Sequence, residues 1–85
     1  MKLKSKFIMQ TIDDMQYLVS MDGPFKGVVR SNETAGFIIR ELENDTTVDN
    51  IVEALFAEYD APKNLLYADV NKVLNALRKI GALDE

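Results

Sequence analysis

The side chains that most often carry enzyme chemistry near neutral pH are missing from this sequence. It contains no histidine and no cysteine, so it has neither the usual general base nor a thiolate nucleophile. Asp13 and Asp14 are adjacent carboxylates, but short acidic side chains that hydrogen-bond the local backbone are typical of a turn. The glycines match no phosphate-binding loop, and no histidine or cysteine is available for a common zinc site. We therefore expect a protein that is not an enzyme and that holds no cofactor or metal ion.

The last third of the sequence contains residues that could bind a partner. A helix is predicted over residues 62–80, where a core-facing stripe is formed by Leu66, Val70, Val73, Leu77 and Ile80. A second row, one residue further along, combines an aromatic ring, an amide, an isobutyl group and a guanidinium in Tyr67, Asn71, Leu74 and Arg78. This row either lines a binding groove or widens the core stripe through Leu74, with Tyr67 and Arg78 at the border.

A strand predicted over residues 26–30 is the second candidate binding element. The edge strand of a sheet exposes unpaired amides and carbonyls, which an extended peptide can satisfy by adding as another strand. The neighbouring side chains would then select the peptide. The candidate peptide-binding residues of this strand are Lys26, Gly27, Val28, Val29 and Arg30.

The elements that must position these residues follow from two periodicities. Short runs of β-branched and aromatic residues predict strands over residues 6–11, 16–20 and 26–30, with a reversal at Asp22-Gly23-Pro24. After Arg30 the period changes to about 3.6 residues, which predicts helices over residues 33–43, 48–59 and 62–80. The predicted fold class is α+β: a three-stranded antiparallel sheet followed by three helices in a single domain, residues 1–85.

Capping residues support these helix boundaries. Ser31 and Asn32 both offer a side-chain oxygen to the first amides of the first helix, and Thr47 does the same for the second. Gly81 is placed to take the left-handed conformation that ends the third helix.

Charge and hydropathy restrict the partners. The net charge of −4 disfavours binding to phosphate backbones or anionic lipid, and no apolar run is long enough to cross a membrane. The absence of an export signal and of cysteine indicates a cytoplasmic protein. The alternative is a winged-helix DNA-binding regulator, since strands with three helices can form that fold. The basic residues of the last helix are scattered around Asp69, which argues against DNA binding.

The order and spacing of several short runs resemble the PqqD family. These runs are Ser31-Asn32-Glu33-Thr34-Ala35-Gly36-Phe37-Ile38, Thr47-Val48-Asp49-Asn50-Ile51-Val52-Glu53-Ala54-Leu55, Tyr59-Asp60, Ala68-Asp69-Val70 and Ile80-Gly81-Ala82-Leu83. The similarity covers residues 26–83 well and is looser over the first 25 residues.

The resemblance implies a winged-helix-like fold and a role as the recognition element for ribosomally synthesised, post-translationally modified peptides. In that family the leader segment of a precursor peptide adds as a strand beside the third strand and packs against the third helix. The core peptide is thereby presented to a modifying enzyme, often a radical S-adenosylmethionine enzyme. We accordingly expect a precursor peptide and a modifying enzyme as partners, no nucleic acid or membrane, and a monomer or weak homodimer.

Overall fold

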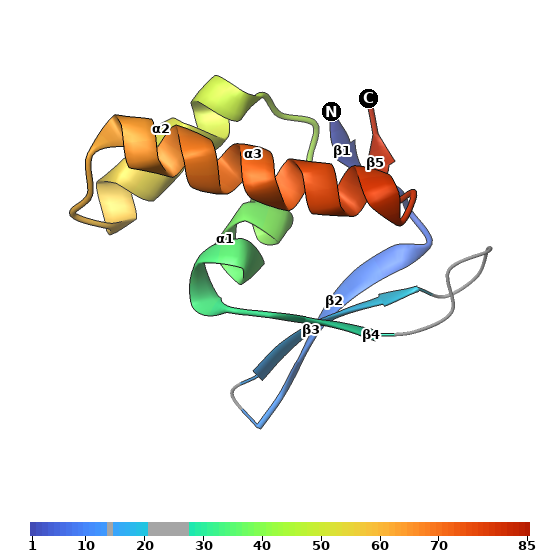
Figure 1. Ribbon diagram of the computed structural model, residues 1–85. Coiled ribbons are helices and arrows are strands. Elements are labelled where there is room, and N and C mark those ends of the chain that lie inside the picture. Colours follow the sequence, from blue (N-terminus) through green and yellow to red (C-terminus); the bar gives the residue numbers. More distant parts are fainter. Residues whose placement is uncertain (14, 21–27) are drawn as a thin grey trace.

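Three helices and two small antiparallel sheets make up the computed structural model, which describes residues 1–13, 15–20 and 28–85 (Figure 1). The strands are β1 (Lys2–Leu3), β2 (Phe7–Ile12), β3 (Met15–Ser20), β4 (Val28–Ser31) and β5 (Leu83–Asp84). The helices are α1 (Glu33–Glu41), α2 (Val48–Glu58) and α3 (Lys63–Lys79). Lys26, Gly27 and the expected reversal at Asp22-Gly23-Pro24 lie outside the described residues.

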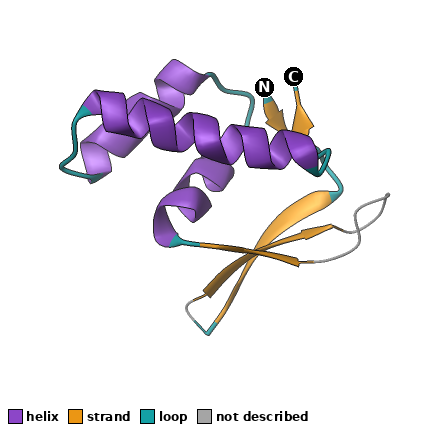
Figure 2. Ribbon diagram, viewed as in Figure 1, coloured by secondary structure: helices purple, strands orange, loops and turns teal. Residues whose placement is uncertain are grey.

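The larger sheet has the order β2-β3-β4, and both pairings are antiparallel. Asp13, in the turn between β2 and β3, has a positive φ of 50°, a conformation that aspartate tolerates better than most residues. The helices pack together on one side of this sheet, which leaves the strands as a separate layer (Figure 2). The α+β class with three helices is therefore confirmed.

The expected three-stranded antiparallel sheet is present as β2-β3-β4, but the sheet prediction is incomplete, because β1 and β5 form a second, two-stranded sheet. Leu3 pairs with Leu83 in this sheet, and the Leu3 amide also donates to the Leu42 carbonyl at 2.7 Å. The two ends of the chain therefore lie side by side (Figure 1).

Side-chain caps begin the first two helices. Asn32 Oδ1 accepts a hydrogen bond from the Ala35 amide at 2.7 Å, and Thr47 Oγ1 accepts one from the Asn50 amide at 3.2 Å. Each bond satisfies an amide that has no partner within its helix. After α3, Gly81 has a φ of +71°, the left-handed conformation that glycine adopts without steric cost.

The core lies among the three helices and continues to the inner face of the sheet. Ile38, Ile51, Leu55 and Val70 are fully buried in it, and Leu18 is the fully buried residue that β3 contributes. Leu18 ties the sheet to the helices, since burying a leucine side chain stabilises the folded state by about 1.5–3 kcal/mol.

Candidate functional site: an edge strand beside a hollow

β4 is an edge of the described part of the sheet. It pairs with β3 through the registers Leu18↔Val29 and Tyr17↔Arg30, and no described strand lies on its other side. β2 forms the opposite edge of the same sheet. Of the five strand residues expected to bind a peptide, Val28, Val29 and Arg30 lie on β4, while Lys26 and Gly27 fall outside the described residues.

A hollow of about 350 Å³ adjoins the end of β4. It lies among β3, the start of α1 and one face of α3, and its lining residues are Leu18, Asn32, Thr34, Ala35, Ile39, Asp69, Lys72, Val73, Ala76 and Leu77. Three of these, Leu18, Ile39 and Leu77, are buried side chains that also belong to the core. The hollow therefore has an apolar floor and can accept an apolar side chain.

The rim of the hollow is polar. Asn32 and Thr34 lie where the chain passes from β4 into α1, and Asp69 and Lys72 lie one turn apart on α3. A small number of polar groups around an apolar cavity is the usual composition of a ligand site, because the polar groups fix the orientation of what binds.

One face of α3 forms the helical wall of the hollow. Asp69, Lys72, Val73 and Ala76 follow the spacing i, i+3, i+4 and i+7, so they share one side of the helix. The row expected from the sequence, Tyr67, Asn71, Leu74 and Arg78, projects from nearly the opposite side of an α-helix of 3.6 residues per turn. None of these four residues lines the hollow.

Leu74, within the expected row, is a core residue. Its exposed fraction is 0% and it packs within the core cluster, so the expectation that Leu74 faces a binding groove is wrong. The alternative weighed for Leu74, a core residue that widens the apolar stripe, describes its position. Val73 and Ile80, which were expected in the core stripe, are only half-buried.

The polar members of that row contact other parts of the chain. The Tyr67 hydroxyl donates to Asp49 Oδ1 on α2 at 2.5 Å, and this hydrogen bond, followed by burial, raises the pKa of Tyr67. Arg78 donates from both Nε and Nη2 to the carboxylate of Glu85, at 2.9 and 2.7 Å. The hydrogen bond raises the pKa of Arg78 and lowers that of Glu85. Asn71 is exposed.

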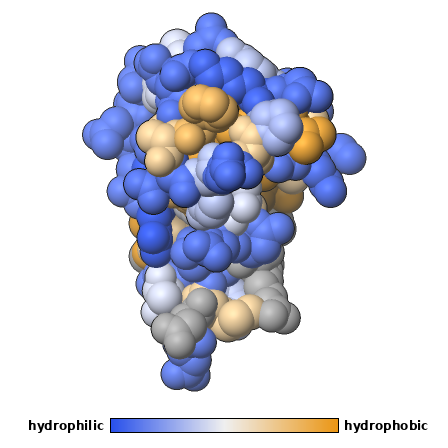
Figure 3. All heavy atoms as spheres, turned by 90° about the vertical axis from the view of Figure 1, so that its left-hand side faces the viewer, coloured by the Kyte–Doolittle hydropathy of each residue, from blue (hydrophilic) through white to orange (hydrophobic). Residues whose placement is uncertain are grey.

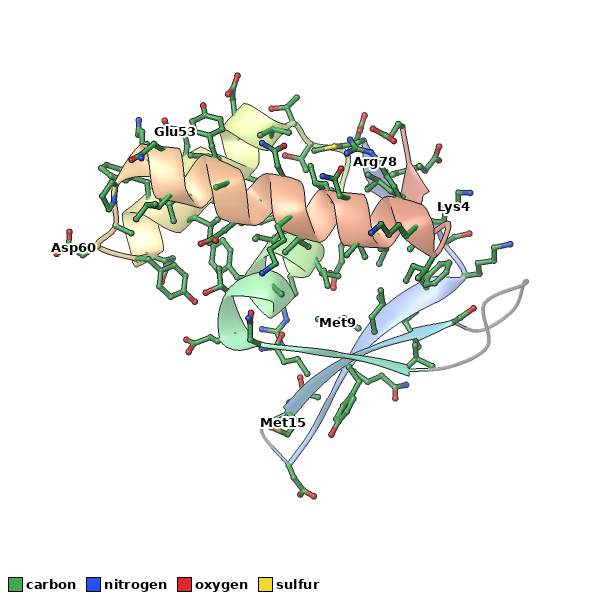
Figure 4. All side chains as sticks on the ribbon, in the orientation of Figure 1. Lys4, Met9, Met15, Glu53, Asp60 and Arg78 are labelled. Atoms are coloured by element: carbon green, nitrogen blue, oxygen red, sulfur yellow. The ribbon has the colours of Figure 1, made fainter. Side chains whose placement is uncertain are left out.

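These contacts lie on the far side of α3 from the hollow, so they brace the helix against α2 and the C-terminal strand. In Figure 4, Arg78 lies beside the C-terminal strand and Glu53 lies over α2, away from the sheet. No pattern in the sequence separates the two sides of α3, because both flank the same apolar stripe.

Two large apolar side chains are exposed outside the hollow. Phe56, near the end of α2, is 48% exposed, and Leu65, near the start of α3, is 53% exposed. Figure 3 shows hydrophobic residues gathered among hydrophilic ones at the end of the helical layer where α2 and α3 are joined. Lys63 covers part of this surface, with Nζ 5.0 Å from the centre of the Phe56 ring and 2.6 Å from Glu53 Oε1. Leu65 lies one turn before Asp69 and extends the row of the hollow toward the start of α3.

The described residues contain no group of three or more acidic, histidine or cysteine side chains that could hold a metal ion. Within the same part of the chain, every helix is too short or too polar to cross a membrane.

Comparison with solved structures shows the same fold in two peptide complexes. One, described as TbiB1 in complex with the TbiA(beta) leader peptide, has a TM-score of 0.83 and 24% sequence identity, over 99% of this chain and 95% of that one. The other, a lasso peptide synthetase B1 complexed with the leader peptide, has a TM-score of 0.78 and 17% identity, over 95% and 93% of the two chains. No curated protein matches the sequence.

A family model resolves the relationship at the level of sequence. The model for coenzyme PQQ synthesis protein D (PqqD) matches residues 17–83, which include β4, all three helices and every residue that lines the hollow. The expected family is confirmed, and this chain belongs to the PqqD family.

Proposed function

We propose that this domain binds the leader segment of a ribosomally synthesised precursor peptide and presents the core peptide to a modifying enzyme. The leader adds as a strand to β4, and one of its apolar side chains enters the hollow beside α3. The observation that carries this proposal is the junction of two features: the edge of β4, which no described strand covers, and an apolar hollow between α3 and the start of α1, where β4 ends. The two structures that share the fold were both determined with a leader peptide.

The two walls divide the work of recognition. The backbone of β4 offers hydrogen bonds to any extended peptide, whereas the hollow admits only side chains that fit it. A flexible leader loses backbone freedom when it docks, and this cost offsets part of the contact energy. We therefore expect micromolar to submicromolar affinity. Tethering raises the effective concentration of the core peptide at the enzyme, by an amount on the order of millimolar for a short linker.

The proposal extends to the partner enzyme and the setting. We propose that the modifying enzyme is a radical S-adenosylmethionine enzyme. The domain has a winged-helix-like fold and acts in the cytoplasm as a monomer or weak homodimer. The domain itself supplies no catalytic group. Its part in the reaction is to hold the peptide.

A pair of phenylalanine substitutions on α3 tests the binding mode. Ala76 and Asn71 are both exposed, but Ala76 lines the hollow and Asn71 lies on nearly the opposite side of the helix. Ala76→Phe fills the hollow and should weaken binding of the precursor leader at least about tenfold, the equivalent of about 1.4 kcal/mol. Asn71→Phe, the matched control, should leave binding unchanged.

Binding is measured by titrating the leader encoded beside this gene into the isotopically labelled domain. The amide signals of β4 and of the residues around the hollow should move, and urea unfolding should show that both variants remain folded. Equal affinity of Ala76→Phe and the unmodified domain would contradict the placement of the leader. Unmoved β4 signals at saturating peptide would contradict strand addition.

The DNA-binding alternative depends on free basic residues on α3. Arg78 is held by Glu85, and Asp69 lies one turn from Lys72, so this helix presents no continuous basic face. A gel shift at low salt, compared between the unmodified domain and a variant with Arg78 and Lys79 exchanged for glutamate, distinguishes the two functions. Leader binding predicts no shift for either protein.

A further inference from the structure

The rim of the hollow has an uneven distribution of charge and hydrogen-bond donors. Along the wall of the hollow, α3 contributes the charged side chains of Asp69 and Lys72 and then the apolar side chains of Val73, Ala76 and Leu77. A peptide that follows α3 would therefore meet a polar region and an apolar region in succession.

Lys72 is available to a ligand. The ion pairs found in the described part of the chain are Met1–Asp45, Lys63–Glu53 and Arg78–Glu85, and none of them involves Lys72 or Asp69. The ammonium group of a lysine carries three donors and no acceptor. Lys72 therefore brings to the rim a positive charge that none of these ion pairs holds, with the carboxylate of Asp69 one turn away.

Asn32 and Thr34 add donors at the same rim. The Oδ1 atom of Asn32 accepts a hydrogen bond from the Ala35 amide, and the NH₂ group of the same side chain supplies two donors. Thr34 contributes a hydroxyl from the first turn of α1, where the helix macrodipole is positive. Among the residues that line the hollow, Asp69 is the one with a carboxylate.

We propose that the hollow selects a leader in which an acidic side chain lies two residues from the apolar side chain that fills the hollow. Lys72 pairs with the acidic side chain, and Asp69 rejects like charge and so limits how strongly acidic leaders bind. This inference rests on the proposed function, since it specifies the peptide that the same site takes.

The spacing follows from element geometry. Lys72 and Ala76 are separated by four residues of helix, about 6 Å along the axis. Alternate residues of a strand point the same way and are about 6.7 Å apart. An added strand can therefore present one side chain to Lys72 and the next side chain on the same face to Val73 and Ala76.

The order of the acidic and the apolar residue in the peptide sequence depends on whether the peptide runs parallel or antiparallel to β4. In Figure 1, β4 runs from right to left toward α1, whereas α3 runs from left to right toward β5. The two elements therefore run in opposite directions. A peptide antiparallel to β4 runs along α3 from Lys72 toward Ala76. Its acidic residue then precedes its apolar residue, whereas a parallel peptide has the reverse order.

A displayed library of short random peptides tests the inference without knowledge of the natural leader. Selection on the unmodified domain should enrich an acidic and an apolar residue separated by one position. Selection on Lys72→Glu should replace the acidic residue by lysine or arginine and keep the apolar one. Lys4→Glu, which makes the same change in net charge, is the matched control and should keep the acidic preference.

Affinities of one selected peptide and its Glu→Gln form then measure the effect. The charge should contribute about two- to fivefold to affinity on the unmodified domain, the range of exposed ion pairs, and nothing on Lys72→Gln. Asp69→Asn should tighten binding of the acidic peptide by a similar factor, while Asp60→Asn should not. Figure 4 shows the two control positions, Lys4 and Asp60, at opposite ends of the helical layer.

The outcomes separate this inference from the proposed function. Enrichment of an apolar residue alone, or the same acidic preference on Lys72→Glu, would overturn the charge selection and leave leader binding intact. Failure to enrich any peptide, with no protection of β4 amides by the natural leader, would overturn both.

Discussion

Gly36 allows α1 to approach the sheet closely. Its replacement by alanine has two opposing effects on stability, since alanine favours the helix while its methyl group crowds the sheet. Gly36 is buried in the middle of α1. A Cβ atom there would lie 1.7 Å from Oε1 and 2.5 Å from Cδ of Gln16 on β3, well inside van der Waals contact. The Oε1 atom of Gln16 is itself buried, and no hydrogen-bond partner for it is found in the part of the chain that the structure describes. Gly36→Ala therefore forces the Gln16 side chain to move.

The magnitudes follow from helix propensity and overpacking. Alanine in place of an interior helix glycine stabilises a helix by about 1 kcal/mol. An added methyl group in a filled site costs about 1–3 kcal/mol. We expect Gly36→Ala to lower the free energy of unfolding by about 0–2 kcal/mol in the unmodified domain. In a Gln16→Ala background the clash is gone, and the same substitution should raise it by about 1 kcal/mol.

A double-mutant cycle measures the coupling between the two positions. Urea unfolding followed by far-ultraviolet circular dichroism gives the four free energies, and the coupling should be about 1–3 kcal/mol. Ala68→Gly, at an exposed position inside α3, calibrates propensity alone and should cost about 1 kcal/mol in both backgrounds. A Gly36→Ala variant that is more stable by about 1 kcal/mol, with no coupling to Gln16, would refute the packing argument.

Three further predictions concern the burial of Leu74, the ion pair of Arg78 with Glu85 and the hydrogen bond of Tyr67 to Asp49. Leu74→Ala should cost about 3 kcal/mol because Leu74 is fully buried, whereas Asn71→Ala should cost less than about 0.5 kcal/mol; equal urea midpoints would contradict the assignment of Leu74 to the core. The pKa of Glu85 is lowered by Arg78, so the pair stabilises the domain above the ordinary value of 4.5 and is lost as pH falls; thermal unfolding should show a smaller loss of stability below pH 4.5 in Glu85→Gln than in the unmodified domain. The pKa of Tyr67 is raised by Asp49, so this contribution is complete below the ordinary value of 10.0 and is lost as pH rises through the folded-state pKa; Tyr67→Phe should show a weaker alkaline loss of stability, and an unchanged alkaline profile would mean that the hydrogen bond contributes nothing.

Local features account for the parts of the fold that the sequence predicts. Asn32 and Thr47 cap helices because a short polar side chain can reach the free amides of its own first turn. The apolar residues of α3 repeat with the 3.6-residue period of the helix because one stripe of it is buried. The sheet of β1 and β5 escapes prediction because each strand has only two residues and its partner lies at the other end of the chain. No periodicity can be read from two residues.

The candidate site is predicted in part, and the limit lies in α3. The edge strand could be anticipated from its run of β-branched residues before α1. The side of α3 that faces the hollow could not, because the rows on either side of the core stripe both mix polar and apolar residues. The packing of α3 against α1 and α2 determines which row faces the hollow. Tyr67 donates a hydrogen bond to Asp49 on α2, and the opposite face of α3 points toward the sheet.

The pairing of β1 with β5 has a consequence for how such a domain can be joined to other proteins. Residues 1 and 85 lie beside one another, above α3 in the view of Figure 1, while β4 lies below that helix. Adjacent ends allow a domain to be inserted into a loop of a host protein with little distortion of either fold. Both connections of an inserted copy would leave from the same side, away from β4, so a host enzyme could carry this domain with the edge of β4 still turned outward.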